Sequence, residues 1–350
     1  MTEEILELID RLEENRSLSA EEYERLLAGR CEQSATELAR RADAAGQRVY
    51  GNRIFTRGLI EISSICRNDC LYCGIRRSNR NAKRYRLTPQ QIQRCADQGY
   101  RLGFRTFVLQ GGEDPYYSDE VLCGIVSGIK REFPDCAVTL SLGERSRESY
   151  RVLHDAGADR YLLRHETADP VLYRKLHPEE MSFENRMRCL RDLKSIGYHT
   201  GCGFMVGPPG QTLTALARDL KFVETFRPEM CGIGPFIPQH DTPFGKEKPG
   251  TPELTCYLLS ILRLIDPGLL LPSTTALGTI DPSGREKGIL AGANVLMPNL
   301  SPPAARENYT LYDGKLSGGI EAAESRELLA ARMRGIGFEL VIDRGDPIRE

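Results

Sequence analysis

Short apolar runs alternate with longer stretches of helical spacing through most of the chain. Eight such runs, each five to seven residues long, cover residues 58–63, 106–110, 137–142, 160–164, 201–206, 230–236, 269–275 and 293–298. Strand-like runs that alternate with helical patterns are typical of βα units that build a parallel sheet. The pattern therefore predicts an α/β fold, a (β/α)8 barrel of the TIM type.

The chain on either side of these runs has a different pattern. Apolar residues at helical spacing predict a helix over 3–14, and a capping box that begins at Ser19 opens a second helix. Another capping box, at Thr88, opens the helix after the first strand, and we expect Gly99 to end it. The predicted parts are an N-terminal helical region, a barrel and a C-terminal cap, at residues 1–50, 51–300 and 301–350.

Composition and charge limit the classes of partner and the compartment that we expect for this chain. The formal net charge is −2, from 47 Lys and Arg against 49 Asp and Glu, so no bulk field favours nucleic acid or an anionic membrane. No stretch approaches the roughly 18 apolar residues of a membrane span, and the acidic start MTEEILELID is unlike a signal peptide. Eight of the 11 cysteines are scattered singly, which suits a reducing compartment. We expect a cytoplasmic protein.

The other three cysteines lie within eight residues, directly after the first predicted strand. Cys66, Cys70 and Cys73 have C-x3-C-x2-C spacing, with Tyr72 before the last. A structural zinc site takes four ligands, and a thioredoxin-like C-x2-C pair would leave Cys66 surplus. A 4Fe-4S cluster normally takes four thiolates, so three would leave one iron open at the barrel mouth. Three surface thiols without a ligand role remain the alternative.

Polar residues also follow the other predicted strands, at the end where a barrel carries its chemistry. They include Gln110 to Glu113, Ser141, Arg164 to Glu166, Thr274, Thr275 and Asn299. His165 and His240 each stand beside a carboxylate residue, and neither is given a chemical role.

The segment CRNDCLYC at 66–73 resembles the signature of radical S-adenosylmethionine (SAM) enzymes. The turn Gln110-Gly111-Gly112-Glu113 resembles the GGE element of that superfamily. The resemblance implies a 4Fe-4S cluster, held by the three cysteines, whose open iron binds SAM. One electron then cleaves SAM and releases a 5′-deoxyadenosyl radical. It further implies that Tyr72 approaches the adenine and that the backbone of the glycine turn meets the methionine amino group of SAM.

Longer segments resemble the HydE family of FeFe-hydrogenase maturases, with methylornithine synthase and biotin synthase as more distant relatives. They are GNRIFTRGLIEIS, RYLLRHET, SFENR, GIGPFIPQHDTPF, GANVLMPN and YTLYDGK. This resemblance implies that Glu166 contacts the ribose hydroxyls and Arg186 the methionine carboxylate of SAM, as their charges suit. It also implies an internal anion-binding substrate pocket lined by Thr139, Arg164, Met230, Thr274, Thr275, Tyr309 and Tyr312.

The resemblance implies a role in assembling the H-cluster, in transient contact with other maturation proteins. The radical would attack the sulfur of an iron–carbonyl–cyanide synthon that carries a cysteine carboxylate. Some members of the family bind an accessory cluster near the C-terminus, but residues 315–328 contain no Cys or His, so we expect one cluster. Two alternatives stay open: a radical SAM enzyme with an amino-acid substrate, similar to methylornithine synthase, and a non-catalytic iron–sulfur scaffold.

Overall fold

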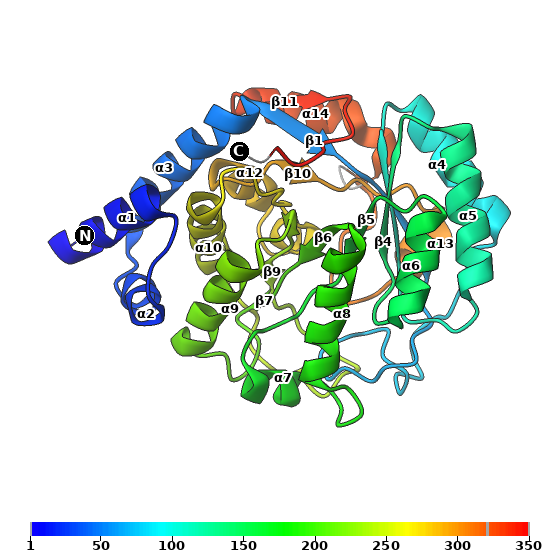
Figure 1. Cartoon of the computed structure of the whole chain (residues 1–350), viewed down its shortest axis with the longest axis horizontal. Helices are drawn as coiled ribbons and strands as arrows, with labels where there is room; N and C mark the ends of the chain where they lie inside the picture. The colour runs from blue at the N-terminus through cyan, green and yellow to red at the C-terminus, as the bar shows by residue number, and fades with distance from the viewer. Residues whose placement is uncertain (1, 320–321, 349–350) are drawn as a thin grey trace.

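A ring of parallel strands surrounded by helices forms the centre of the molecule (Figure 1). The structure is a computed structural model and describes residues 2–319 and 322–348. Six strands form one sheet in the order β2-β3-β4-β5-β6-β8. They are β2 (Gly58–Ser63), β3 (Thr106–Gly111), β4 (Ala137–Ser141), β5 (Arg160–Leu162), β6 (His199–Cys202) and β8 (Met230–Cys231).

Isolated parallel bridges close this sheet into a barrel. They join Met230 to Leu270, Pro272 to Val295 in β10 (Val295–Leu296), and Asn299 back to Leu59 in β2. The predicted (β/α)8 fold is therefore confirmed. The seventh predicted strand makes only these bridges, because Pro272 has no N–H to donate and α11 begins directly after Thr274.

The fifth and sixth predicted strands are each broken into two pieces. β7 (Met205–Val206) and β9 (Gly234–Pro235) pair with each other, separately from β6 and β8. The break lies where Gly203, at φ 154°, approaches Gly232: a Cβ on Gly203 would be 2.0 Å from the Gly232 carbonyl oxygen. Two glycines allow this close approach of backbones.

Helices cover the outside of the barrel (Figure 1). They are α4 (Pro89–Arg101), α5 (Asp119–Glu132), α6 (Arg147–Asp155), α7 (Pro170–Leu176), α8 (Phe183–Ile196), α9 (Leu213–Phe226), α10 (Pro252–Ile265), α11 (Thr275–Ile280) and α12 (Gly284–Leu290). The capping boxes at Ser19 and Thr88 are confirmed. The prediction that Gly99 ends α4 is wrong, since the helix continues to Arg101. Gly99 is buried, and a Cβ there would lie 2.5 Å from Leu300 Cδ1, so this glycine serves helix packing instead.

Three helices precede the barrel, and the elements that follow it pack at both of its ends. The N-terminal helices are α1 (Glu3–Asn15), α2 (Ala20–Ala28) and α3 (Glu32–Tyr50), of which α2 packs on α9 and α3 on α10. After the barrel come α13 (Pro303–Asn308), η2 (Ala323–Ser325), α14 (Arg326–Gly335) and β11 (Glu339–Val341). β1 (Arg53–Thr56) joins β10 to β11. The division into three parts stays a prediction.

Contacts place the C-terminal segments at opposite ends of the barrel. The Leu311 carbonyl accepts a hydrogen bond from Gly74 in the cysteine loop, at the C-terminal ends of the strands. The Arg344 carbonyl accepts hydrogen bonds from Thr106 and Arg160, at the opposite end. None of the described helices has the length and apolar character that a membrane crossing requires.

Candidate functional site

The three clustered cysteines lie on the loop that leaves β2. Each is partly exposed, Cys70 Sγ lies 3.7 Å from Met181 Sδ, and the Cys73 amide donates to the Cys70 carbonyl at 3.4 Å. Burial raises the pKa of all three thiols, that of Cys73 to about 12. The charges of Cys73 and Cys66 further raise the pKa of Cys70, because like charges repel in a desolvated site.

The predicted glycine turn packs directly against this loop. The Gly112 amide donates to the Ser63 carbonyl at 3.1 Å, and the Arg67 amide donates to the Glu113 carbonyl at 3.0 Å. A Cβ on Gly112 would lie 2.3 Å from the Ile65 carbonyl oxygen, so only glycine fits. The structure thus brings the ends of β2 and β3 together. Gln110 and Gly111 are the last residues of β3.

A second group of predicted residues meets beside the cysteines. Glu166 Oε2 lies 3.0 Å from Arg164 Nη2, and Arg186 Nη1, from α8, donates to the Arg164 carbonyl at 2.5 Å. Two aromatic side chains connect this group to the cysteine loop: the Arg186 guanidinium lies 5.7 Å from the centre of the Tyr173 ring, Tyr173 stacks on His177, and His177 Nε2 lies 3.4 Å from the Tyr72 hydroxyl. Arg186 and Glu166 are therefore neighbours, each with a different charged partner.

Glu166 has an unusual backbone. Its φ is 65°, and the other non-glycine residues with positive φ in the described chain, Arg16 and Arg227, end helices. The conformation is held by two backbone bonds: the Glu166 amide donates to Gly203 at 3.0 Å and its carbonyl accepts from Met205 at 3.1 Å. Left-handed backbone at a bulky residue costs about 1 kcal/mol or more and tends to occur at functional sites.

Glu144, which the sequence reasoning missed, holds Arg186. Its Oε1 accepts from Arg186 Nε at 2.6 Å and its Oε2 accepts from Asn185 Nδ2 at 2.6 Å. Burial acts against the charge of Arg186, but Tyr173 and Glu144 outweigh it and raise the pKa of the guanidinium. Glu144 follows β4 by three residues, so the rule that barrel chemistry follows strand ends could have found it.

We expect Glu144→Gln to lower the free energy of unfolding by about 2 kcal/mol, because it removes the charge that offsets a buried guanidinium. For a chain of this size that is a fall in melting temperature of roughly 3 °C, measurable by calorimetry on the metal-free chain. Glu148→Gln is the matched control, since Glu148 is 65% exposed and pairs with Arg151 on one helix turn. Equal melting temperatures for the two variants would contradict the assignment.

The seven predicted pocket residues differ in what they contact. The buried hydroxyls of Thr139 and Thr274 have no hydrogen-bond partner within the described part of the chain. Thr275 Oγ1 accepts from Arg285 Nη2 at 3.1 Å, so it is committed to a neighbour. Tyr309 is buried, which raises its phenol pKa well above the usual range, whereas Tyr312 is half-buried.

Three charged side chains near these residues were also missed. Arg57 is buried, its Nη1 donates to Met230 Sδ at 2.8 Å, and its Nε and Nη2 have no hydrogen-bond partner in residues 2–319 and 322–348. Desolvation lowers its pKa well below the usual value. Glu61 and Lys315 form a buried pair at 2.8 Å, with Lys315 5.3 Å from the centre of the Tyr309 ring. Unpartnered buried cations and hydroxyls are what an anionic ligand would satisfy.

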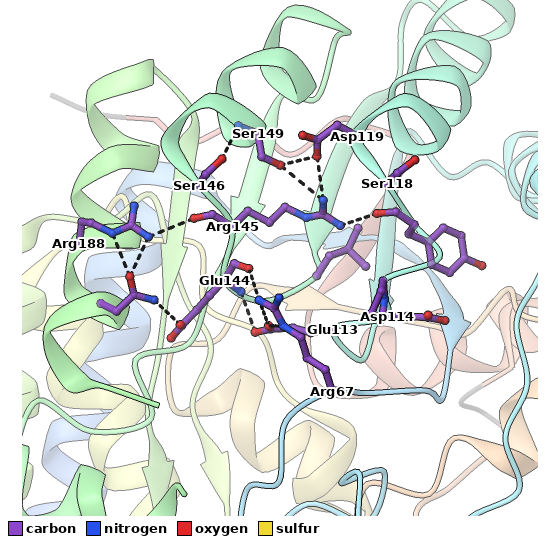
Figure 2. Close-up of a pocket in the computed structure, with 14 residues that line it drawn as sticks. Arg67, Glu113, Asp114, Ser118, Asp119, Glu144, Arg145, Ser146, Ser149 and Arg188 are labelled. Carbon is purple, nitrogen blue, oxygen red and sulfur yellow. Dashed lines mark hydrogen bonds and ion pairs between the residues drawn. The ribbon is translucent and has the colours of Figure 1, made fainter. Parts of the chain in front are cut away.

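Figure 2 shows a cleft of about 590 Å³ on the outer side of the same strand ends. It lies between the cysteine loop and the beginnings of α5, α6 and α8, and none of the seven pocket residues lines it. Its arginines already have partners: Arg67 bonds to Glu113 and Arg145 to Asp119 (Figure 2). Arg188 bonds to Asn185 and, outside the cleft, to Asp192. The cleft is polar, and its charges are neutralised internally.

The buried histidine of this region is structural. Burial lowers the pKa of His165 to about 3, its Nδ1 accepts from the Gly203 amide at 3.3 Å, and its Nε2 lies 3.3 Å from Asp219. His165 therefore stays neutral and fixes the backbone beside Glu166.

Comparison with known proteins gives the family. The radical SAM superfamily matches residues 60–223. The [FeFe] hydrogenase maturase subunit HydE of Thermotoga maritima is 51% identical over 275 residues, which cover 79% of this chain and 78% of that protein. The chain belongs to the radical SAM superfamily and, within it, to the HydE family. Members of the radical SAM superfamily are enzymes that bind a 4Fe-4S cluster and SAM.

More distant relatives agree with the fold. The 3-methylornithine synthase of Methanosarcina acetivorans is 28% identical over 340 residues, 97% of this chain and 95% of that protein. A crystal structure of methylornithine synthase has a TM-score of 0.82 and 26% identity, and covers 95% of this chain and 97% of its own. The hydrogenase maturase HydG shares the fold, with a TM-score of 0.79 at 20% identity over 97% of this chain and 76% of its own.

The residues present fit a cluster rather than a single ion. Within the described ranges, no three His, Cys, Asp or Glu side chains surround one point where a metal ion could bind. A 4Fe-4S cubane has no such requirement, because each thiolate takes its own iron. The thiols of this loop oppose each other's ionisation, and the positive charge of cluster iron would favour their thiolate forms.

Proposed function

We propose that the chain cleaves SAM reductively and acts in assembly of the FeFe-hydrogenase H-cluster, on a cysteine-bearing iron carbonyl cyanide synthon. The observation that carries the proposal is the meeting of the cysteine loop, the glycine turn and the pair of Glu166 and Arg186 at one mouth of the barrel. The resemblance to HydE over four-fifths of the chain supports the substrate assignment. The eight cysteines of this chain that lie outside the cysteine loop are scattered singly and form no disulfide in the described residues, which favours a cytoplasmic setting.

Each residue at the mouth has a proposed role. Cys66, Cys70 and Cys73 would hold one cluster, which supplies the electron that breaks a carbon–sulfur bond of SAM. Glu166 can accept the two ribose hydroxyls, and Arg186, oriented by Glu144, matches the methionine carboxylate. The backbone from Gln110 to Glu113 would face the methionine amino group, and Tyr72 the adenine.

The inside of the barrel suits an anionic substrate. The hydroxyls of Thr139 and Thr274 and two nitrogens of the buried Arg57 guanidinium, Nε and Nη2, lack partners in the described chain and can hold a carboxylate or cyanide ligand away from water. Arg164, Met230, Thr275, Tyr309 and Tyr312 complete the proposed pocket. We expect transient contact with the other maturation proteins that supply the synthon and receive the product.

Anaerobic reconstitution tests the cofactor part of this proposal. We expect about four irons and four sulfides per chain, and 5′-deoxyadenosine with methionine after addition of dithionite and SAM. About eight irons would contradict the single cluster. A loaded chain that never cleaves SAM would favour an iron–sulfur scaffold.

Complementation tests the biological part. The chain should restore hydrogenase activity in an extract that lacks only its HydE, and should make no methylornithine from lysine. Failure of the first or success of the second would contradict the assignment to hydrogenase maturation.

A further inference from the structure

A short segment that follows the barrel contacts its mouth. Residues 309–315, YTLYDGK, form no helix or strand, and we name them the mouth segment. Its middle residues, 310–314, are half-buried or exposed. The chain on either side is held separately, because Arg306 Nη2 donates to both carboxylate oxygens of Glu324 at 2.8 and 3.1 Å. The mouth segment has few buried apolar side chains, which is typical of segments that open locally while the rest of a fold stays intact.

Two contacts join the mouth segment to loops at the C-terminal ends of the strands. The Leu311 carbonyl accepts from the amide of Gly74, directly after the last cysteine of the loop, at 2.9 Å. The Asp313 amide donates to the Pro238 carbonyl at 3.0 Å, and Asp313 Oδ1 lies 2.7 Å from His240 Nδ1. The mouth segment therefore bridges the cysteine loop and the loop that follows β9.

The third contact is a buried ion pair with the first barrel strand. Lys315 Nζ lies 2.8 Å from Glu61 Oε1, the Glu61 side chain is fully buried, and that of Lys315 is 9% exposed. Ile60 and Ile62 belong to the main hydrophobic core, so the Glu61 side chain lies on the opposite face of β2. Apart from this contact, the two Glu61 oxygens and Lys315 Nζ form no hydrogen bond with the part of the chain that the structure describes.

Closing this ion pair costs free energy as well as releasing it. Burial removes both charges from water, and their attraction offsets that cost only where further hydrogen bonds satisfy the remaining donors and acceptors. Those hydrogen bonds are missing among the described residues, and burial raises the pKa of Glu61 even beside Lys315. Both groups would be hydrated if the segment opened. The closed arrangement is therefore favoured by a narrow margin, as an element with two states requires.

The same lysine connects closure to the proposed pocket. Lys315 Nζ lies 5.3 Å from the centre of the buried Tyr309 ring, so the ammonium contacts both Glu61 and Tyr309. Gly314, at φ 67°, turns the chain between Asp313 and Lys315. Glycine adopts this backbone without strain, so the turn can re-form each time the segment closes.

We propose that the mouth segment is a lid that opens to admit the substrate, and that Lys315 closes it through its contact with Glu61. The inference rests on the proposed function, which places the substrate in the barrel beside Tyr309 and Tyr312. Lys315 is a positioning residue, because it acts through Tyr309 and the lid. Closure completes the pocket and keeps water away from the radical reaction.

Hydrogen–deuterium exchange of the cluster-loaded chain measures lid opening in three variants. Lys315→Met removes the ammonium and leaves Glu61 as a buried carboxylate without a partner charge. Glu61→Met/Lys315→Met replaces the whole pair by apolar side chains of similar length. Lys130→Met is the matched control, since Lys130 is a partly buried lysine 3.2 Å from Asp159, which precedes β5 at the opposite end of the barrel.

The amides of Gly74 and Asp313 report on the lid, because the closed segment protects both. In the wild type they should exchange at least about 100-fold faster than the amides of β2, since the lid opens without unfolding of the barrel. Lys315→Met should raise their exchange about tenfold, and the double variant should return it to the wild-type rate or below, because apolar side chains can replace a buried ion pair without loss. The control should leave it unchanged. Exchange as slow as in β2, or no effect of Lys315→Met, would overturn the proposal.

Two activity assays show whether the lid serves the substrate. Lys315→Met should keep its iron and its dithionite-driven formation of 5′-deoxyadenosine, because the cysteines are untouched. Its rate of hydrogenase maturation in the complementation extract should fall about tenfold, in step with the smaller closed population, and should recover in the double variant. Unchanged maturation despite faster lid exchange would overturn the proposal. Failure of the wild type to restore maturation would instead contradict the proposed function.

Discussion

Replacing Cys70 by serine is expected to abolish cluster binding and with it SAM cleavage. A 4Fe-4S cluster already limited to three protein thiolates loses a third of its anchoring, and a serine hydroxyl ionises far less readily than a thiol. Iron should fall from about four per chain to near zero, and 5′-deoxyadenosine should become undetectable. Metal analysis, absorbance of the reconstituted chain and product analysis measure these changes.

Cys123→Ser provides the control for this variant. Cys123 is a half-buried thiol on α5 whose Sγ lies 3.5 Å from the Val152 carbonyl, away from the cysteine loop. It should keep the full iron content and the wild-type rate. Retention of four irons and of SAM cleavage in Cys70→Ser would show that another ligand set holds the cluster.

Local patterns predicted the part of the site that lies on one strand end. The three cysteines lie within eight residues, and β2 is recognisable as the short apolar run GLIEIS, which the structure buries along its whole length. The Gly112 turn was found in the same way, and the structure adds why it must be glycine: it packs on the carbonyl of Ile65. Parallel strands in a closed barrel then bring both turns to one mouth, which follows from topology alone.

Residues whose importance depends on packing were missed. Glu144 is one acid in a polar loop until α8 brings Arg186 to 2.6 Å from it. Arg57 stands between two apolar runs, and only closure of the ring buries its guanidinium. Gly99 shows the reverse error, because a rule for helix ends was applied to a glycine that the barrel requires for close packing.

The second large effect is expected at Glu166, where two substitutions separate backbone strain from ligand binding. Glu166→Ala and Glu166→Gly both remove the carboxylate, so each should weaken SAM binding about 100-fold, the equivalent of two charge-assisted hydrogen bonds worth about 3 kcal/mol together. They differ in the backbone, since glycine adopts a φ of 65° without strain and alanine does not.

The glycine variant should therefore be about 1 kcal/mol more stable than the alanine variant, a difference of roughly 1 to 2 °C in melting temperature. Both lack the ion pair with Arg164, so that loss cancels in the comparison. Calorimetry on the metal-free chain and SAM titration of the loaded chain measure the two quantities. A stabilised Gly variant that still binds SAM as the wild type does would show that Glu166 serves only to neutralise Arg164. Weaker SAM binding in both variants, with the alanine form less stable, would show that the strained backbone is kept for the ligand that the carboxylate holds.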